Sequence, residues 1–486
     1  MGKSPCGMKN MNKYKKLLSN TGLITLGTFG SKILVFFLTP LYTYLLTDAE
    51  FGSADLLAQT AKLLLPILSL GITEAVFRFA MDRAEDPKKV LTAGFTVLGA
   101  GALLYVIAAP VLGLFEMFHG SVWLIVCYTA ASSLHTMVSL YIRTKDHFKF
   151  YAVQGVVNTL LVILFNLLFL MVFDLGVTGY VLSVAVADFA VFLLIFAVEK
   201  LWRDLVPLCS VPKKLWKDML RYSIPLIPNT VFWWIISVSD RYMVTHFVGQ
   251  GANGIYAAAY KIPTLITLVC QVFAQAWTYS SVLEDDKKER SEFFSRVFTF
   301  YLAVLFVGAS GIILFSKLFT GVLFHESYYE SWRYIPVLTL ATVFSSLVTF
   351  MGSVYTVSKK SLPAMLTVTA GAITNIVLNF LLIPKTLGGV SLVGMGAMGA
   401  AIATLISYAV VFAARAATAK SHVPFDMHLP LLGMNTLLVG AQALLMIMEV
   451  PLWWLWEGLL VMAVVLLNAR ALLPYLKKVL HFAKKS

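Results

Sequence analysis

Charged residues stand inside several otherwise apolar stretches of this chain. The stretch "WWIISVSDRYMV" (Trp233–Val244) contains an adjacent aspartate and arginine. A charge at mid-bilayer costs about 2.5–3.5 kcal/mol on insertion scales, so such residues normally face a polar cavity or a partner. Six residues are of this kind: Lys32, Lys62, Asp188, Asp240, Arg241 and Lys261. Four cations against two acids predict a polar interior with a net positive charge.

The basic residues of this set are suited to binding an anion. Asp240 and Arg241 are neighbours in sequence and point about 100° apart on a helix, so they do not form a local ion pair. Paired Lys and Arg make strong charge-assisted hydrogen bonds with phosphate. An interhelical ion pair is the alternative for Arg241, and a side chain that reaches the membrane surface is the alternative for Lys62. We predict an anion site formed by Arg241, Lys261, Lys32 and Lys62.

The two acids are candidates for binding a coupling ion. Asp188 lies alone in "SVAVADFAVF", where a structural pair with Lys32 or Lys62 is the alternative. The sequence contains no "GxxxxGK[ST]" motif, which predicts that energy comes from an ion gradient, the membrane potential or downstream consumption rather than from ATP. The four cysteines have no metal-ligand spacing, so we expect neither a metal site nor a cofactor. Asp188 and Asp240 are therefore the predicted ion-coupling residues.

The composition indicates which elements carry these residues. The chain has 486 residues, of which 59% are hydrophobic and 13% are charged, more apolar surface than one water-soluble globule can bury. Roughly fourteen apolar segments have the length of about 20 residues that a spanning helix needs. They are too long and continuous for the strands of a membrane barrel. We predict an all-α polytopic membrane protein of about fourteen transmembrane helices.

The distribution of basic residues predicts the orientation. With the amino terminus inside, 31 of the 38 Lys and Arg residues fall in inner segments, and only Lys317, Arg333 and Lys385 fall in outer loops. This is a strong positive-inside pattern with both termini in the cytoplasm. The formal charge of +13 is thus a topology signal and does not indicate nucleic-acid binding.

The longest polar interruption, Glu199–Ser223, separates six spans from eight. A faint internal repeat relates "LTPLYTYLLTDAEFGSADLL" on one side to "SDRYMVTHFVGQGANGIYAAAYKIP" on the other. We expect two six-helix lobes around a central cavity, followed by two further helices. The predicted segments are a basic cytoplasmic tail (1–22), an N-lobe with helices 1–6 (23–198), a cytoplasmic inter-lobe loop (199–222), a C-lobe with helices 7–12 (223–420), helices 13–14 (421–475) and a basic cytoplasmic tail (476–486).

Two quoted regions also carry a family resemblance. "TLGTFGSKILVFFLTPLYTYLLTDAEFG" with "LLPILSLGITEAVFRF", and "YSIPLIPNTVFWWIISVSDRYMVTHFVGQGANGIYAAAYKIP", resemble the oligosaccharide flippases. These form the polysaccharide-transporter branch of the multidrug/oligosaccharidyl-lipid/polysaccharide exporter superfamily. The likeness covers residues 21–80 and 221–300.

The resemblance implies a cavity that opens alternately to each side of the bacterial cytoplasmic membrane. It implies a substrate of undecaprenyl-diphosphate-linked oligosaccharide, moved to the outer leaflet for surface polysaccharide such as capsule, exopolysaccharide or O-antigen-like polymer. Basic cavity residues would contact the anionic part of that substrate. Membrane lipids, a polysaccharide polymerase and chain-length machinery are the implied partners.

Three alternative functions use similar architecture or chemistry. A flippase for a peptidoglycan lipid-diphosphate precursor would need the same cationic chamber. A multidrug cation exporter would instead need acids there. A membrane polysaccharide polymerase or ligase should place general acids or bases and Arg on a sizeable outer loop, whereas the outer loops here are short. We therefore expect a transporter and not an enzyme.

Overall fold

Helices make up almost all of the described chain. The computed structural model describes residues 30, 33–34, 36–82, 84–115, 118, 120–271, 273, 287–357, 361–419 and 425–483. The chain divides into two compact units, Met1–Leu46 with Ser53–Trp234 (unit 1) and Thr47–Gly52 with Ile235–Ser486 (unit 2).

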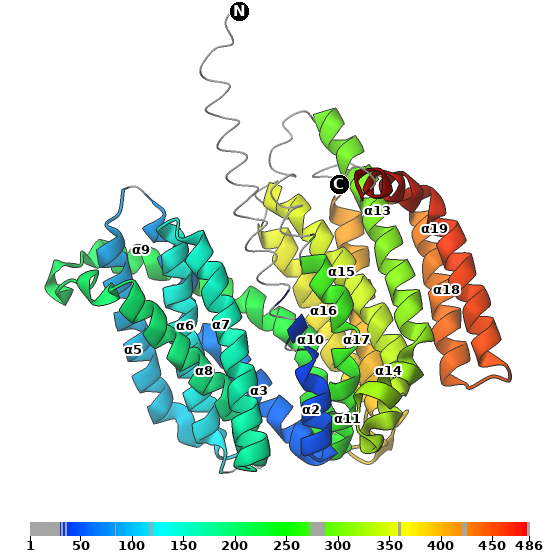
Figure 1. Cartoon of the computed structure of the whole chain (residues 1–486), viewed down its shortest axis with the longest axis horizontal. Coiled ribbons are helices and arrows are strands. Elements are labelled where there is room, and N and C mark those ends of the chain that lie inside the picture. The colour runs from blue at the N-terminus through cyan, green and yellow to red at the C-terminus, as the bar shows by residue number, and fades with distance from the viewer. Residues whose placement is uncertain are drawn as a thin grey trace, which may run out of the picture. The chain divides into compact units, whose positions relative to one another are not determined.

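Unit 1 is built mainly from long helices, of which α5, α6, α7 and α8 lie side by side (Figure 1). Its elements are α2 (Leu38–Leu45), α3 (Asp48–Leu68), α4 (Ile72–Ala80), α5 (Pro87–Leu112), α6 (Val122–Thr144), α7 (Phe148–Asn166), the π-helical turn η2 (Leu167–Val172), α8 (Gly176–Val198), η3 (Leu201–Arg203), η4 (Leu208–Ser210), α9 (Lys213–Ser223) and η5 (Ile224–Leu226). The first turn of α3 belongs to unit 2.

Unit 2 has two closely packed helix groups, α15 with α16 and α17, and α13 with α18 and α19. Its elements are α10 (Ile227–Phe247, from Ile235 onward), α11 (Gln250–Lys261), α13 (Lys287–Leu314), α14 (Ser316–Leu323), η6 (Glu326–Arg333), α15 (Ile335–Val357), α16 (Ser361–Leu382), the hairpin of β1 (Thr386–Leu387) and β2 (Val390–Ser391), α17 (Ala397–Ala419), α18 (Leu429–Ile447) and α19 (Trp453–Ala483).

Many of these helices have the length and apolarity of membrane spans. Ten described helices are long and apolar enough to cross a membrane, or eleven if the pair α3 and α4, bent by 53°, counts as one span. Helices satisfy their own backbone hydrogen bonds, which is what a lipid environment requires. The prediction of an all-α polytopic membrane protein is confirmed. Two of the roughly fourteen apolar segments in the sequence, centred near residues 35 and 268, lie partly outside the described residues.

The segment predicted as the inter-lobe loop packs onto unit 1. Leu201, Val211, Leu215 and Met219 are buried in one apolar core cluster with residues of α4, α5, α6 and α8. Full burial of such side chains contributes about 1.5–3 kcal/mol each. The division between the two compact units falls after Trp234, within α10.

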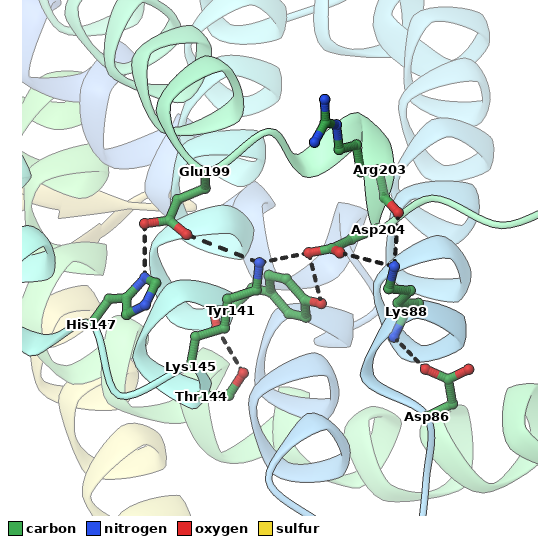
Figure 2. A network of polar contacts seen from close by, with 9 residues as sticks. All are labelled: Asp86, Lys88, Tyr141, Thr144, Lys145, His147, Glu199, Arg203 and Asp204. Atoms are coloured by element: carbon green, nitrogen blue, oxygen red, sulfur yellow. Dashed lines mark hydrogen bonds and ion pairs between the residues drawn. The ribbon is translucent and has the colours of Figure 1, made fainter.

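Charged side chains form ion pairs between the start of the same segment and the helix ends of unit 1 (Figure 2). The Lys145 ammonium, at the end of α6, lies 2.6 Å from the Asp204 carboxylate and 4.0 Å from Glu199. Lys88, at the start of α5, lies 3.5 Å from the other Asp204 oxygen. The imidazole of His147 lies 2.8 Å from Glu199. Single pairs of this kind contribute little, but the network links the ends of α5, α6 and α7 through two carboxylates, Asp204 and Glu199.

The Thr47–Gly52 turn packs against the start of α11. A Cβ added to Gly254 would lie 1.8 Å from the Asp48 carbonyl oxygen, and one added to Gly52 would lie 2.2 Å from the Gln250 carbonyl oxygen. The Asn253 side-chain amide donates a hydrogen bond of 2.9 Å to the Gly52 carbonyl. Only glycine permits this backbone approach. The two glycine-containing turns of the internal repeat therefore contact each other.

Candidate functional site

Asp240 and Arg241 lie together in the interior of unit 2. Both are buried, with 0% and 7% of their surface exposed. Asp240 Oδ2 accepts hydrogen bonds from the Tyr256 hydroxyl of α11 at 2.6 Å and the Thr404 hydroxyl of α17 at 3.0 Å. The Arg241 guanidinium lies 4.8 Å from the centre of the Tyr260 ring, within cation–π range. The carboxylate thus contacts groups on two other helices, in agreement with the helical geometry of adjacent residues.

Neutral oxygens and amides extend this polar cluster. The Asn375 side-chain oxygen accepts hydrogen bonds from Ser239 at 2.9 Å and from Asn379 at 3.0 Å, and the Asn375 amide lies 3.4 Å from the Thr404 hydroxyl. One carboxylate among neutral oxygens offers hard ligands, the type that hard cations prefer. In the part of the chain that the structure describes, no group of three His, Cys, Asp or Glu residues could hold a metal ion.

The other predicted basic residues are distributed over the two units. Lys261 ends α11, directly after Tyr260; it is half-buried, with its ammonium 5.8 Å from the centre of the Phe51 ring. Lys62 lies on α3 in unit 1 and is exposed. Lys32 lies outside the described residues. Among the described residues, Arg241 and Lys261 are the predicted anion ligands that share a unit, and they lie on successive helices.

Asp188 is the centre of a buried polar cluster in unit 1. It lies on α8, and its Oδ1 is 3.0 Å from His135 Nδ1 of α6 and 3.0 Å from the Asn158 amide nitrogen of α7. Its Oδ2 accepts a hydrogen bond from the Ser132 hydroxyl. The other ring nitrogen, His135 Nε2, lies 2.8 Å from the Gln154 side-chain oxygen. Asp188 therefore has an ion-pair partner in His135 when the imidazole is protonated.

The atoms around this pair indicate its protonation. Both ring nitrogens of His135 face acceptor oxygens, which matches an imidazolium that donates twice. Both oxygens of Asp188 face donors, which matches a deprotonated carboxylate. A metal cation at Asp188 would meet these donors rather than further oxygens. A cluster of this composition is suited to binding and releasing a proton.

Sequence inspection missed further buried charges. Asp55, Arg415 and Glu457 are buried, in "SADLLAQ" of α3, "AARAA" of α17 and "WLWEGLL" of α19. Each would have been found by asking which charges interrupt an apolar segment. Among acidic and basic residues that the structure describes as buried, histidine apart, four acids (Asp55, Asp188, Asp240 and Glu457) stand against two arginines. The predicted positive excess therefore depends on lysines, and the two that the structure describes, Lys62 and Lys261, are at least partly exposed.

Comparison with known proteins identifies related families. The family model described as "Polysaccharide biosynthesis protein" matches residues 17–279. This range contains all six intramembrane charges that the sequence singled out. No curated protein sequence matches the chain.

Solved structures share the fold at low sequence identity. An inward-closed structure of the lipid II flippase MurJ is 15% identical with a TM-score of 0.69, over 94% of this chain and 99% of that one. An inward-facing multidrug resistance MATE transporter is 14% identical with a TM-score of 0.61, over 80% and 94% of the two chains. A MOP superfamily transporter from Pyrococcus furiosus, described as having a binding pocket of reverse polarity, is 13% identical with a TM-score of 0.58, over 83% and 96%.

Proposed function

Because the chain belongs to the polysaccharide biosynthesis protein family, we propose that it is a flippase for undecaprenyl-diphosphate-linked oligosaccharide units. It would move them across the bacterial cytoplasmic membrane by alternating access, for export of surface polysaccharide. The family match carries this proposal, since it covers more than half of the chain and confirms the resemblance seen in the sequence. The MOP-type fold of MurJ and the MATE transporters supports a membrane transporter.

The proposed anion site consists of Arg241, Lys261, Lys32 and Lys62. Arg241 is its central residue, because a buried guanidinium presents a planar set of donors that matches phosphate oxygens. The stacked Tyr260 ring restricts the orientation of that guanidinium. Lys261 follows Tyr260 and would add a second charge from the neighbouring helix. A diphosphate in a low-dielectric chamber would gain strong charge-assisted hydrogen bonds from such residues.

Ion coupling is proposed at Asp188 and Asp240. The contact of Asp188 with His135, a side chain that titrates near neutral pH, supports a proton as the ion bound in unit 1. The oxygen-rich surroundings of Asp240 in unit 2 also allow a cation to bind. An imposed pH gradient would then drive the transport cycle through the Asp188 cluster.

A flippase for a peptidoglycan lipid-diphosphate precursor is the second candidate. The observation that favours it is the coverage of 94% of this chain by the lipid II flippase fold, against 80% for the MATE transporter and 83% for the MOP superfamily transporter. The substrates of both candidate functions contain a lipid diphosphate, so the same anion site would bind either of them. A multidrug cation is less compatible with Arg241 and Lys261.

Location and partners follow from this function. Both termini would lie in the cytoplasm of a bacterial cell, as the distribution of basic residues predicts. A polysaccharide polymerase and chain-length machinery would accept the units at the outer leaflet.

Transport by reconstituted protein tests the proposal. Proteoliposomes containing wild type, Arg241→Ala, Arg241→Lys or Arg333→Ala would be given a defined undecaprenyl-diphosphate oligosaccharide or a peptidoglycan lipid-diphosphate precursor. We expect Arg241→Ala to lose most transport and Arg241→Lys to keep part of it, because lysine retains the charge. Arg333→Ala is the control, since Arg333 is exposed and pairs with Glu330.

Two outcomes would contradict the proposal. Full transport by well-inserted Arg241→Ala would remove the assigned role of that residue. Failure of the wild type to move either lipid under any imposed ion gradient would refute the flippase assignment. Movement of the peptidoglycan precursor alone would select the second candidate.

A further inference from the structure

A basic pocket lies at one end of α13, α18 and α19. It has a volume of about 450 Å³, and its lining includes Arg296 and Thr299 of α13, His428 at the start of α18, and Arg470 and Pro474 of α19. All three helices belong to unit 2 and pack against one another. None of these residues takes part in the anion site or in the two acid clusters, so the pocket is a separate site.

The pocket has a net positive charge. Arg296 and Arg470 are both exposed, and in the described ranges neither forms an ion pair with a carboxylate. The Arg296 Nε donates a hydrogen bond of 3.4 Å to the backbone carbonyl of Glu292. His428 lies 3.1 Å from the Asp426 carboxylate, so this pair adds no net charge when the imidazole is protonated. Two guanidiniums thus remain available to an anionic group.

The pocket lies at a helix bend on the predicted cytoplasmic side. Pro474 stands inside α19, and Figure 1 shows the last turns of that helix, in dark red, turning away from its long axis. A proline removes one backbone hydrogen bond and commonly causes such a kink. The sequence after the bend, "YLKKVLHFA", is apolar and basic, as is typical of a helix in the membrane–water interface. The pocket therefore opens at the expected depth of lipid phosphates.

Apolar side chains are exposed on the two helices that lead away from the pocket. They include Leu437 of α18 and Met462, Leu466 and Leu473 of α19. In a membrane this surface contacts acyl chains. A phospholipid could place its phosphate between the two arginines and its acyl chains along this surface. Such a lipid would match both the basic pocket and the apolar surface. Basic pockets between helices on the cytoplasmic side are known to bind anionic headgroups.

We propose that the pocket formed by Arg296, His428 and Arg470 binds the phosphate headgroup of an anionic membrane phospholipid. The bound lipid would hold the cytoplasmic ends of α13, α18 and α19 together. This site does not depend on which lipid-linked sugar the protein transports. It makes the packing of the last two helices sensitive to the anionic lipid content of the inner leaflet.

Lipid binding to the full-length protein tests this site without a transport assay. Fluorescent phosphatidylglycerol would be titrated into the protein in micelles of a neutral detergent. At a membrane surface each arginine contributes about fivefold in affinity, so Arg296→Gln/Arg470→Gln should weaken binding about thirtyfold. Arg203→Gln/Arg221→Gln is the matched control, because both residues are exposed arginines outside the pocket and on the predicted cytoplasmic face. This control should bind as the wild type does.

Competition identifies the source of the phosphate. We expect unlabelled phosphatidylglycerol to displace the probe, and inorganic diphosphate and undecaprenyl diphosphate to displace it weakly. Displacement by undecaprenyl diphosphate but not by phosphatidylglycerol would overturn the phospholipid assignment. So would equal affinity of the pocket variant and the control. Arg296→Lys/Arg470→Lys, which keeps both charges, should retain most of the affinity and so separates lost binding from misfolding.

Discussion

The Asp188–His135 pair allows a quantitative prediction. Asp188→Ala removes the acceptor for the Ser132 hydroxyl, the His135 ring nitrogen and the Asn158 amide, all in the interior of unit 1. A buried donor left unsatisfied costs about 1–3 kcal/mol, and breaking a buried ion pair costs about 3–5 kcal/mol in total. Because Ser132 can rotate its hydroxyl to another acceptor, we expect a loss of about 3–5 kcal/mol in the free energy of unfolding.

A double-mutant cycle separates the pair from the loss of packing. Each single variant, Asp188→Ala or His135→Ala, leaves one polar partner without its counterpart. The double variant removes both partners of the pair. Its loss in the free energy of unfolding should therefore be smaller than the sum of the losses of the two single variants, by about 0.5–3 kcal/mol. His135→Gln should cost less than His135→Ala, because an amide can still donate to the carboxylate.

Chemical unfolding of the purified protein in mixed micelles measures these values. Glu292→Ala is the control, since its exposed carboxylate makes no ion pair with a described residue, and it should change stability by less than about 0.5 kcal/mol. Additive effects of the two single variants, or a cost of Asp188→Ala equal to that of the control, would show that the pair is not coupled as its geometry implies.

Two further predictions concern unit 2. Gly254→Ala would place a Cβ 1.8 Å from the Asp48 carbonyl oxygen, so we expect overpacking to lower the free energy of unfolding by about 1–3 kcal/mol and to lower the melting temperature. Gly308→Ala is the control, because its Cβ would meet nothing within 4 Å, and it should be neutral or stabilising. Equal effects of the two substitutions would refute the contact. The Lys317 ammonium, 2.7 Å from Glu449, lowers the pKa of that carboxyl below its usual value. The pair therefore stabilises the fold above the ordinary pKa of glutamate and loses this effect as the pH falls through the lowered pKa. Glu449→Gln should reduce the acid dependence of the melting temperature, and an unchanged dependence would contradict this.

The apolar runs of the sequence were sufficient to predict the helices and the membrane class. Each span of a membrane protein must be apolar along its own length, so this information is local. The burial of Asp240 and Arg241 was also predictable, because both interrupt such a run. Their exact partners were not, since Tyr256 and Thr404 come from other helices.

The rest required knowledge of distant contacts. His135 is separated from Asp188 by 53 positions, and nothing in "SSLHTMVSL" indicates which carboxylate it meets. The segment after α8 was predicted as a cytoplasmic inter-lobe loop, because it is the longest polar interruption in the sequence. The core of unit 1 nonetheless buries four of its side chains, those of Leu201, Val211, Leu215 and Met219. Position along the chain alone did not reveal that the segment belongs to the preceding unit.

The packing of Thr47–Gly52 has a consequence for how the protein can change shape. This turn belongs to unit 2, whereas α2 before it and most of α3 after it belong to unit 1. Two continuous helices, α3 at Gly52 and α10 at Trp234, therefore pass from one unit into the other. Large φ/ψ changes in a domain rotation are absorbed by a few hinge residues. The chain also passes from unit 1 into unit 2 between Leu46 and Thr47, in the short connection from α2 to α3. Two of the three hinges would therefore lie inside helices, and a rotation of the units would bend α3 and α10.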